Sequence, residues 1–232
     1  MSATADIFTA IHKAIRSMIY SLGGQLQTLD FADRGATERL LAEIRIDFAS
    51  SLGANCVLCL LHAHAGSEEW GAFPQVSKVE PGLIAGLLAE HHDITTRLTR
   101  ISERSTELLA LDDPGARVEA GARLNREVND FFAAYLLHMN HEETELVPAM
   151  QKHFTDEQIF AMQAAIEHHV PQERLVAYLE WLLPSLNATE LTAVITGAKE
   201  DAPPELVRIV TTIGETKVDP ARWKVVSARL AS

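Results

Sequence analysis

Two segments of the sequence combine a histidine with a pair of glutamates in the same order. Glu68 lies four residues after His64, and Glu142 lies four residues after His138. A second glutamate directly follows each of these, and a proline stands ten residues after each histidine. Residues four apart lie on one face of an α-helix. Each imidazole–carboxylate pair can therefore bind the same metal ion, or one ion and its neighbour.

Each pair is preceded by one further histidine, His12 before the first and His91 before the second, and each of these has an isoleucine three residues later. The sequence therefore predicts a tandem of two helical hairpins, each with one lone histidine and one His-x-x-x-Glu pair. Four imidazoles and two carboxylates exceed the four ligands of a tetrahedral zinc site. They suit two iron ions about 3.5–4 Å apart, with each glutamate bridging the two ions.

The elements that must position these residues are predicted to be helices throughout, because apolar residues recur at three- and four-residue spacing. Capping residues mark several helix starts: Asp113 before Pro114, Thr155 three residues before Gln158, Asn187 three residues before Glu190, and Asp219 before Pro220. Four long helices are expected at 4–27, 34–71, 79–110 and 114–151, and shorter ones at 156–183, 188–199, 203–213 and 219–230. The expected fold is all-α: an up-down-up-down four-helix bundle over residues 1–155, with a C-terminal helical extension, residues 156–232, packed on it.

This ligand pattern resembles that of the hemerythrin-like proteins of the HHE cation-binding family, which are four-helix bundles around a non-haem di-iron centre. The resemblance covers about residues 1–155. It implies two iron ions, bridged by both glutamates and by an oxo or hydroxo group. The ligands that it implies are His12, His64, Glu68, His91, His138 and Glu142.

The pattern departs from that of the oxygen-carrying hemerythrins, which have HxxxH on the third helix and HxxxxD on the fourth. Neither spacing occurs in this sequence. The set of four histidines and two glutamates is instead similar to that of bacterial iron–sulfur cluster repair and nitric-oxide-responsive proteins. Reversible oxygen transport is therefore not the expected function.

Neighbouring histidines offer competing registers. His91 and His92 point about 100° apart on a helix, so only one of them can face the metals, and the Glu-His-x-Asp-Ile context favours His91. On the fourth helix His141 and Glu145 form a second HxxxE pair, but the alignment of the prolines favours the pair that begins at His138.

Two further motifs stand apart from this pattern. Cys56 and Cys59 form a CxxC, but a thioredoxin-type redox site needs a βαβ context. We therefore expect these cysteines to pack inside a helix, with no disulfide framework. His168 and His169 repeat the context of His91 and His92. A helix packed on the bundle is expected there, and the alternative is that one of these histidines approaches the metal pocket or binds an extra ion.

Composition restricts the partners. The chain has 232 residues, of which 47% are hydrophobic, and a formal net charge of −12. An acidic chain is poorly suited to nucleic acid or an anionic membrane, because both are bound through a basic face. The sequence has no run of about 18 apolar residues, and its first residues do not follow the pattern of a secretory signal. The expected location is the cytoplasm.

The expected function is the binding of a small ligand at the di-iron centre. Six protein ligands, two of them bridging, leave about four of twelve octahedral positions for bridging oxygen, water, O₂ or NO. By analogy with the family, the chain is expected to bind O₂, NO or peroxide in sensing, stress response or iron handling, with a redox or iron-acceptor protein as a further partner. The alternative is a di-iron oxidase or oxygenase acting on a small substrate.

Overall fold

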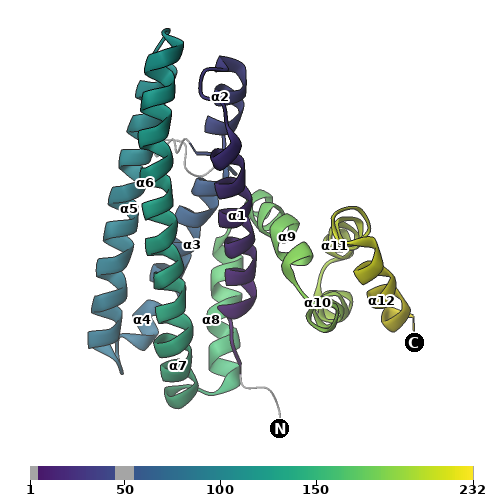
Figure 1. Cartoon of the computed structure of the whole chain (residues 1–232). Coiled ribbons are helices and arrows are strands. Elements are labelled where there is room, and N and C mark those ends of the chain that lie inside the picture. The colour runs from purple at the N-terminus through teal and green to yellow at the C-terminus, as the bar shows by residue number, and fades with distance from the viewer. Residues whose placement is uncertain (1–4, 45–54, 232) are drawn as a thin grey trace. The chain divides into compact units, whose positions relative to one another are not determined.

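The computed structural model describes residues 5–44 and 55–231, and every regular element in these ranges is a helix. The prediction of an all-α protein is therefore confirmed. No helix in the described ranges is long and apolar enough to cross a membrane. The α-helices (Figure 1) are α1 Thr9–Thr28, α2 Arg34–Leu41, α3 Val57–Gly71, α4 Phe73–Val76, α5 Pro81–Leu109, α6 Pro114–His141, α7 Val147–His153, α8 Asp156–His169, α9 Gln172–Ser185, α10 Ala188–Asp201, α11 Pro204–Lys217 and α12 Pro220–Leu230, and a π-helix, η1, spans Glu142–Leu146.

Contacts divide the chain into two compact units. The first comprises Met1–Phe8 and Met18–Pro171, and the second comprises Thr9–Ser17 and Gln172–Ser232. Helix α1 is thus shared, with its first half counted in the second unit. The predicted domains, 1–155 and 156–232, stay a prediction.

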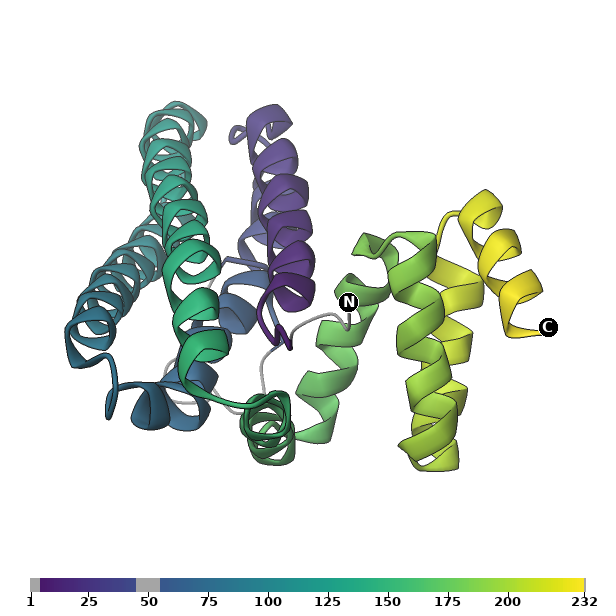
Figure 2. The ribbon, with the colours of Figure 1, turned by 90° about the horizontal axis from the view of Figure 1, so that it is seen from below.

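In the first unit the longest helices, α5 and α6, run side by side along their length (Figures 1 and 2). Both begin with a proline, whose missing N–H costs nothing in the first turn. The Asp113 side chain caps α6 by accepting from the backbone N–H of Ala116. Helix α3 packs against α5 and α8, and a Cβ at Gly23 of α1 would lie 3.7 Å from the ring of Phe132 on α6.

Two predicted helices are interrupted. The helix expected at 34–71 is not continuous, because α2 ends at Leu41 and Cys56 is extended as the N-cap of α3; residues 45–54 lie outside the described ranges. Their sequence contains Ser50, Ser51 and Gly53, which are poor helix formers. The helix expected at 156–183 is broken between α8 and α9. There Val170 is extended, because a proline disfavours helical backbone in the residue before it.

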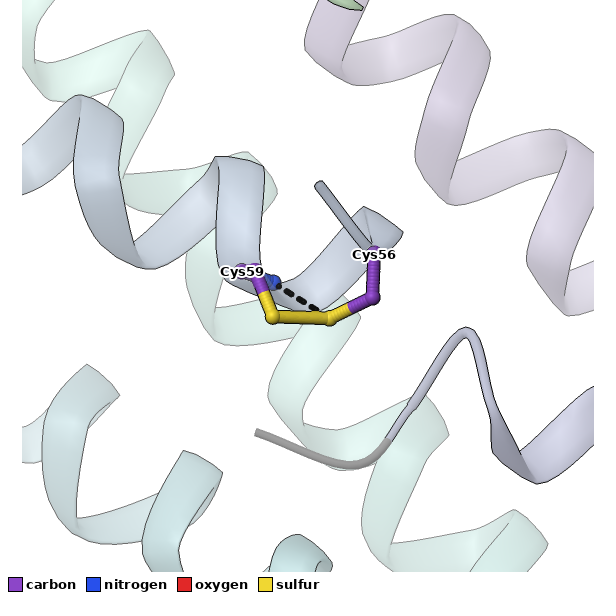
Figure 3. Close-up of a disulfide and its surroundings, with 2 residues drawn as sticks. All are labelled: Cys56 and Cys59. Atoms are coloured by element: carbon purple, nitrogen blue, oxygen red, sulfur yellow. Dashed lines mark hydrogen bonds between the residues drawn. A yellow bond between two sulfur atoms is a disulfide. The ribbon is translucent and has the colours of Figure 1, made fainter. Parts of the chain in front are cut away.

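The prediction that both cysteines pack inside a helix without a disulfide is wrong, because the chain is not helical at Cys56. Cys56 lies at the start of α3 and not within a helix, so its sulfur can reach Cys59 in the first turn. The two are joined by a disulfide (Figure 3).

One close contact in the first unit gives a stability prediction. A Cβ at Gly121 of α6 would lie 2.1 Å from the ring of Phe31, which is buried. Gly121→Ala is therefore expected to lower the free energy of unfolding by about 1–3 kcal/mol through overpacking. Urea denaturation followed by circular dichroism measures this change.

The matched control is Gly86→Ala on α5, where a Cβ meets nothing within 4 Å. This variant is expected to gain about 0.5–1 kcal/mol, because alanine loses less backbone entropy than glycine on entering a helix. Equal stability of the two variants would contradict the described packing of Phe31.

The second unit has its own apolar core, to which α9, α10, α11 and α12 all contribute. Its helix starts follow the predicted capping residues. Asn187 and Glu190 form a capping box at α10, and Asp219 caps α12. The Arg222 guanidinium donates to the carbonyls of Pro184 and Leu186 and so ties α12 to the end of α9. The buried core residues are Leu179, Leu183, Leu186, Leu191, Ile195, Val210, Ile213, Val218 and Val226.

Candidate metal centre

The buried faces of α5 and α6 carry polar residues where apolar ones would otherwise pack. On α5 the buried stripe runs through Leu87, His91 and Ile94, at three- and four-residue spacing. On α6 it runs through Tyr135 and His138. A buried polar side chain is costly unless it is hydrogen-bonded or binds an ion. These two positions therefore need a local partner.

The structure brings four such residues together in the first unit. Glu68, His91, His138 and Glu142 each offer one ligand atom, these atoms lie within 4.8 Å of one another, and all four residues are buried. They come from α3, α5, α6 and η1. Three segments remote in sequence thus meet at one cluster of imidazole and carboxylate groups, which could hold a metal ion.

The two central histidines face each other. His91 Nε2 lies 2.9 Å from His138 Nε2. On their far sides, His91 Nδ1 is 2.8 Å from Glu69 Oε1 and His138 Nδ1 is 2.7 Å from Glu90 Oε2. A carboxylate only accepts, so each neutral ring carries its proton on Nδ1. Each Nε2 then presents a lone pair, and two facing lone pairs at this distance repel each other unless a proton or a metal ion lies between them.

The spacing of these nitrogens fits one metal ion. Two imidazole nitrogens bound at about 2.1 Å and at right angles lie about 3.0 Å apart. That value matches the 2.9 Å between His91 Nε2 and His138 Nε2. The donor set, imidazole with carboxylate, is one that iron, zinc and manganese accept.

The Glu68 carboxylate lies between two histidines. Its Oε1 is 2.9 Å from His64 Nε2, and its Oε2 is 3.4 Å from His91 Nε2. His64 is itself buried on α3, one turn before Glu68. The two oxygens of one carboxylate therefore face two separate imidazoles.

Glu142 occupies a special backbone position. It begins the π-helix η1, directly after α6, and its Oε1 lies 3.4 Å from His138 Nε2. Single π-helical turns are rare and occur often at functional sites. Pro148 follows in the first turn of α7. The proline on which the sequence alignment rested thus marks the end of this irregular turn.

The carboxylates favour positive charge at the centre. Burial lowers the pKa of His91, whereas its hydrogen bonds with Glu68 and Glu69 and the charges of Glu68 and Glu142 raise it. The net effect is a pKa above the ordinary value for histidine. The same carboxylates would stabilise a metal cation at this position.

Sequence reasoning missed the roles of Glu69 and Glu90. Each accepts from the Nδ1 of a histidine in the cluster, and Glu90 also lies 2.8 Å from His141 Nδ1. Such partners fix the tautomer and orientation of a metal-binding imidazole. The signal was present, since Glu69 is the second glutamate of its motif and Glu90 directly precedes His91. However, each partner histidine lies on a different helix, so the pairing is not readable from spacing.

The other candidate histidines differ in burial. His12 is buried in the first turns of α1; these turns count with the second unit, so its place among the ligands stays a prediction. His92 is exposed. His168 and His169 are exposed as well, and the His169 ring stacks on Trp70 with centroids 4.2 Å apart. Within the described ranges neither belongs to a group of ligand-type residues.

Tyr135 has a structural contact beside the cluster. Its hydroxyl donates to the carbonyl of Leu61 on α3 at 2.8 Å, and its ring meets that of His138 edge-on. The phenol therefore ties α6 to α3 one turn before His138 and fixes the separation of two ligand-bearing helices.

Comparison with protein-family models gives no match for this chain, and comparison with curated proteins and with solved structures gives none either. The case for a metal centre therefore rests on the geometry of these side chains.

Proposed function

We propose that this chain is a hemerythrin-like non-haem di-iron protein of the HHE type. Its four long helical segments would then form the up-down-up-down bundle expected from the sequence. The observation that carries the proposal is the placement of Glu68, whose two oxygens face His64 and His91. An ion bound beside His91 would use only one of these two oxygens, whereas two ions, one beside each histidine, would use both.

In the proposed centre, His91 and His138 bind one ion, and His64 with His12 binds the other. Glu68 and Glu142 would be shared by the two ions. Iron is favoured over a single zinc, because this set holds more nitrogen and oxygen ligands than a tetrahedral site uses. When bound, the di-iron centre supplies redox-active ions with exchangeable coordination positions.

We further propose that O₂, NO or peroxide is the ligand, in sensing, stress response or iron handling. The protein's part is to hold the imidazoles and exclude bulk water. Glu69 and Glu90 keep the Nδ1 protons in place, and the Phe73 ring stacks on His91 with centroids 5.2 Å apart. The burial of the cluster would favour ligands as small as these over larger ones. A redox partner or an iron acceptor would then meet the protein at its surface.

A second candidate function, a di-iron oxidase or oxygenase, is favoured by one observation. A surface pocket between α5 and α6 is lined by polar groups from Glu90, Asp93 and His138 together with apolar side chains. It therefore lies beside His138, a proposed ligand. A small substrate that docks there would lie close to the centre.

The test uses the full-length chain loaded anaerobically with Fe(II). Separate titrations with O₂, NO and hydrogen peroxide are followed by absorption spectroscopy. A di-iron protein of this kind is expected to develop near-ultraviolet charge-transfer bands with at least one of the three ligands. Reversal on removal of the ligand indicates sensing, and repeated turnover with a reductant indicates an enzyme. Spectra identical to those of free iron would overturn the proposal.

A further inference from the structure

The two cysteines of the chain stand together at the start of α3 (Figure 3). Cys56 is the N-cap residue, Cys59 lies in the first turn, and the two sulfurs are bonded. The backbone N–H of Cys59 also donates a hydrogen bond to Cys56 Sγ at 3.1 Å. All thiol chemistry of this protein therefore takes place at one CxxC pair.

This disulfide is poorly placed to act as a structural staple. A disulfide stabilises mainly by restricting the unfolded chain, and its effect grows with the length of the loop that it closes. Here the sequence separation is only 3. Opening the bond therefore lowers the stability of the fold only slightly, and reversible exchange requires this.

The two cysteine residues differ in exposure. Cys59 is 5% exposed, whereas Cys56 is half-buried. Attack on a disulfide requires access to the sulfur that is attacked. Because Cys56 is the more exposed residue, we assign its Sγ as the atom that an incoming thiolate attacks and Cys59 as the leaving group. This asymmetry assigns distinct roles to the two residues.

The local backbone stabilises a thiolate on Cys56. Its sulfur accepts the hydrogen bond from Cys59 N–H, and it stands at the positive end of the 15-residue helix α3. Helix N-termini favour the thiolate, which is the reactive form of cysteine. This chemistry needs only the helix start and does not depend on a βαβ context.

We propose that Cys56–Cys59 is a thiol–disulfide exchange site whose substrates are dithiols and their disulfides. A substrate thiolate attacks Cys56 Sγ, the bond between the two cysteines breaks, and Cys59 leaves as a thiolate that takes up a proton. The second substrate thiol then attacks the mixed disulfide. It releases Cys56 and leaves the substrate as a disulfide. Two electrons and two protons pass to the chain, and the reverse reaction reduces a disulfide.

The pair selects against monothiols. A monothiol joined to Cys56 is expelled when Cys59, three residues away, attacks the mixed disulfide. A dithiol instead completes the exchange within one complex. This inference does not depend on the proposed metal centre, since it uses neither iron nor any of the six proposed ligands.

The first test compares single variants, each of which keeps one thiol. At pH 6.5, Cys56 in the folded Cys59→Ser variant is expected to react with iodoacetamide at least about tenfold faster than Cys59 in Cys56→Ser. It should also react at least about tenfold faster than the same variant unfolded in guanidinium. Circular dichroism verifies that both variants are helical. Equal rates in the folded and unfolded states would overturn the proposal.

The second test uses the wild-type full-length chain and so does not depend on the variants folding. The chain is expected to accelerate the reduction of insulin disulfides by dithiothreitol. In a glutathione redox buffer, intact mass should show the oxidised and reduced chain but no stable glutathione adduct. Both results must be the same for metal-free and iron-loaded protein. Failure to accelerate insulin reduction, or a persistent adduct on the wild-type chain, would contradict the assignment.

Discussion

Replacing Glu68 with glutamine is expected to abolish binding of the second iron ion. The glutamine side chain is nearly isosteric with glutamate but keeps one ligand oxygen, because its NH₂ group only donates. It can bind one ion and cannot bridge two. Iron per chain, measured by mass spectrometry after anaerobic loading and desalting, should fall from about two to about one or less. The bridging disposition of Glu68 is the physical reason, since its oxygens face His64 and His91.

The metal-free Glu68→Gln variant is expected to be at least as stable as the metal-free wild type. A buried carboxylate is costly to desolvate, and the amide removes that cost. Loss of iron without loss of stability would show that Glu68 serves the metal site and not the fold. Glu145→Gln is the control, because Glu145 lies on η1 close to Glu142 but is exposed. If Glu68→Gln bound as much iron as Glu145→Gln, the bridging role would be excluded.

Glu90→Gln is expected to weaken iron binding about 10–100-fold without removing a ligand. The Glu90 carboxylate lies 2.7 Å from His138 Nδ1 and 2.8 Å from His141 Nδ1. A glutamine amide can accept from one of these rings, but its NH₂ group faces the other. His138 would thus lose its fixed tautomer and the negative charge behind it. Competition with a chromogenic chelator measures the affinity.

Asp93→Asn provides the matched control for Glu90→Gln. Asp93 lies on the same helix and lines the same pocket, and it pairs with Arg97, one turn away, at an exposed site. The substitution removes the same charge from the neighbourhood without touching a histidine of the cluster. Equal losses of affinity in the two variants would mean that long-range charge, and not the contact with His138, governs binding.

The sequence was sufficient to predict the helical class and those helix starts that carry capping residues, because capping residues act locally. Thr155 with Gln158 and Asn187 with Glu190 form the expected capping boxes. It was also sufficient to favour His91 over His92, because helical periodicity lets only one of them face the cluster and the surrounding residues match the family pattern at His91. His91 is buried in the cluster, whereas His92 is exposed.

Two features could not be predicted because they depend on contacts between helices or on local breaks. Glu90 lies beside His91 in the sequence but serves His138 on the facing helix, and periodicity along one helix contains no such information. The disulfide was missed because the expected helix ran through Cys56. In the structure Cys56 is the extended N-cap residue, and its sulfur is bonded to that of Cys59 in the first turn.

The most direct test of the central claim is the number of iron ions per chain in anaerobically loaded, full-length protein, measured together with the His138→Ala and His64→Ala variants. The account predicts about two ions in the wild type, with a loss of iron in each variant. His92→Ala, at an exposed histidine, should retain both ions. One ion or none in the wild type, or full retention of iron in His138→Ala and His64→Ala, would contradict the proposed di-iron centre.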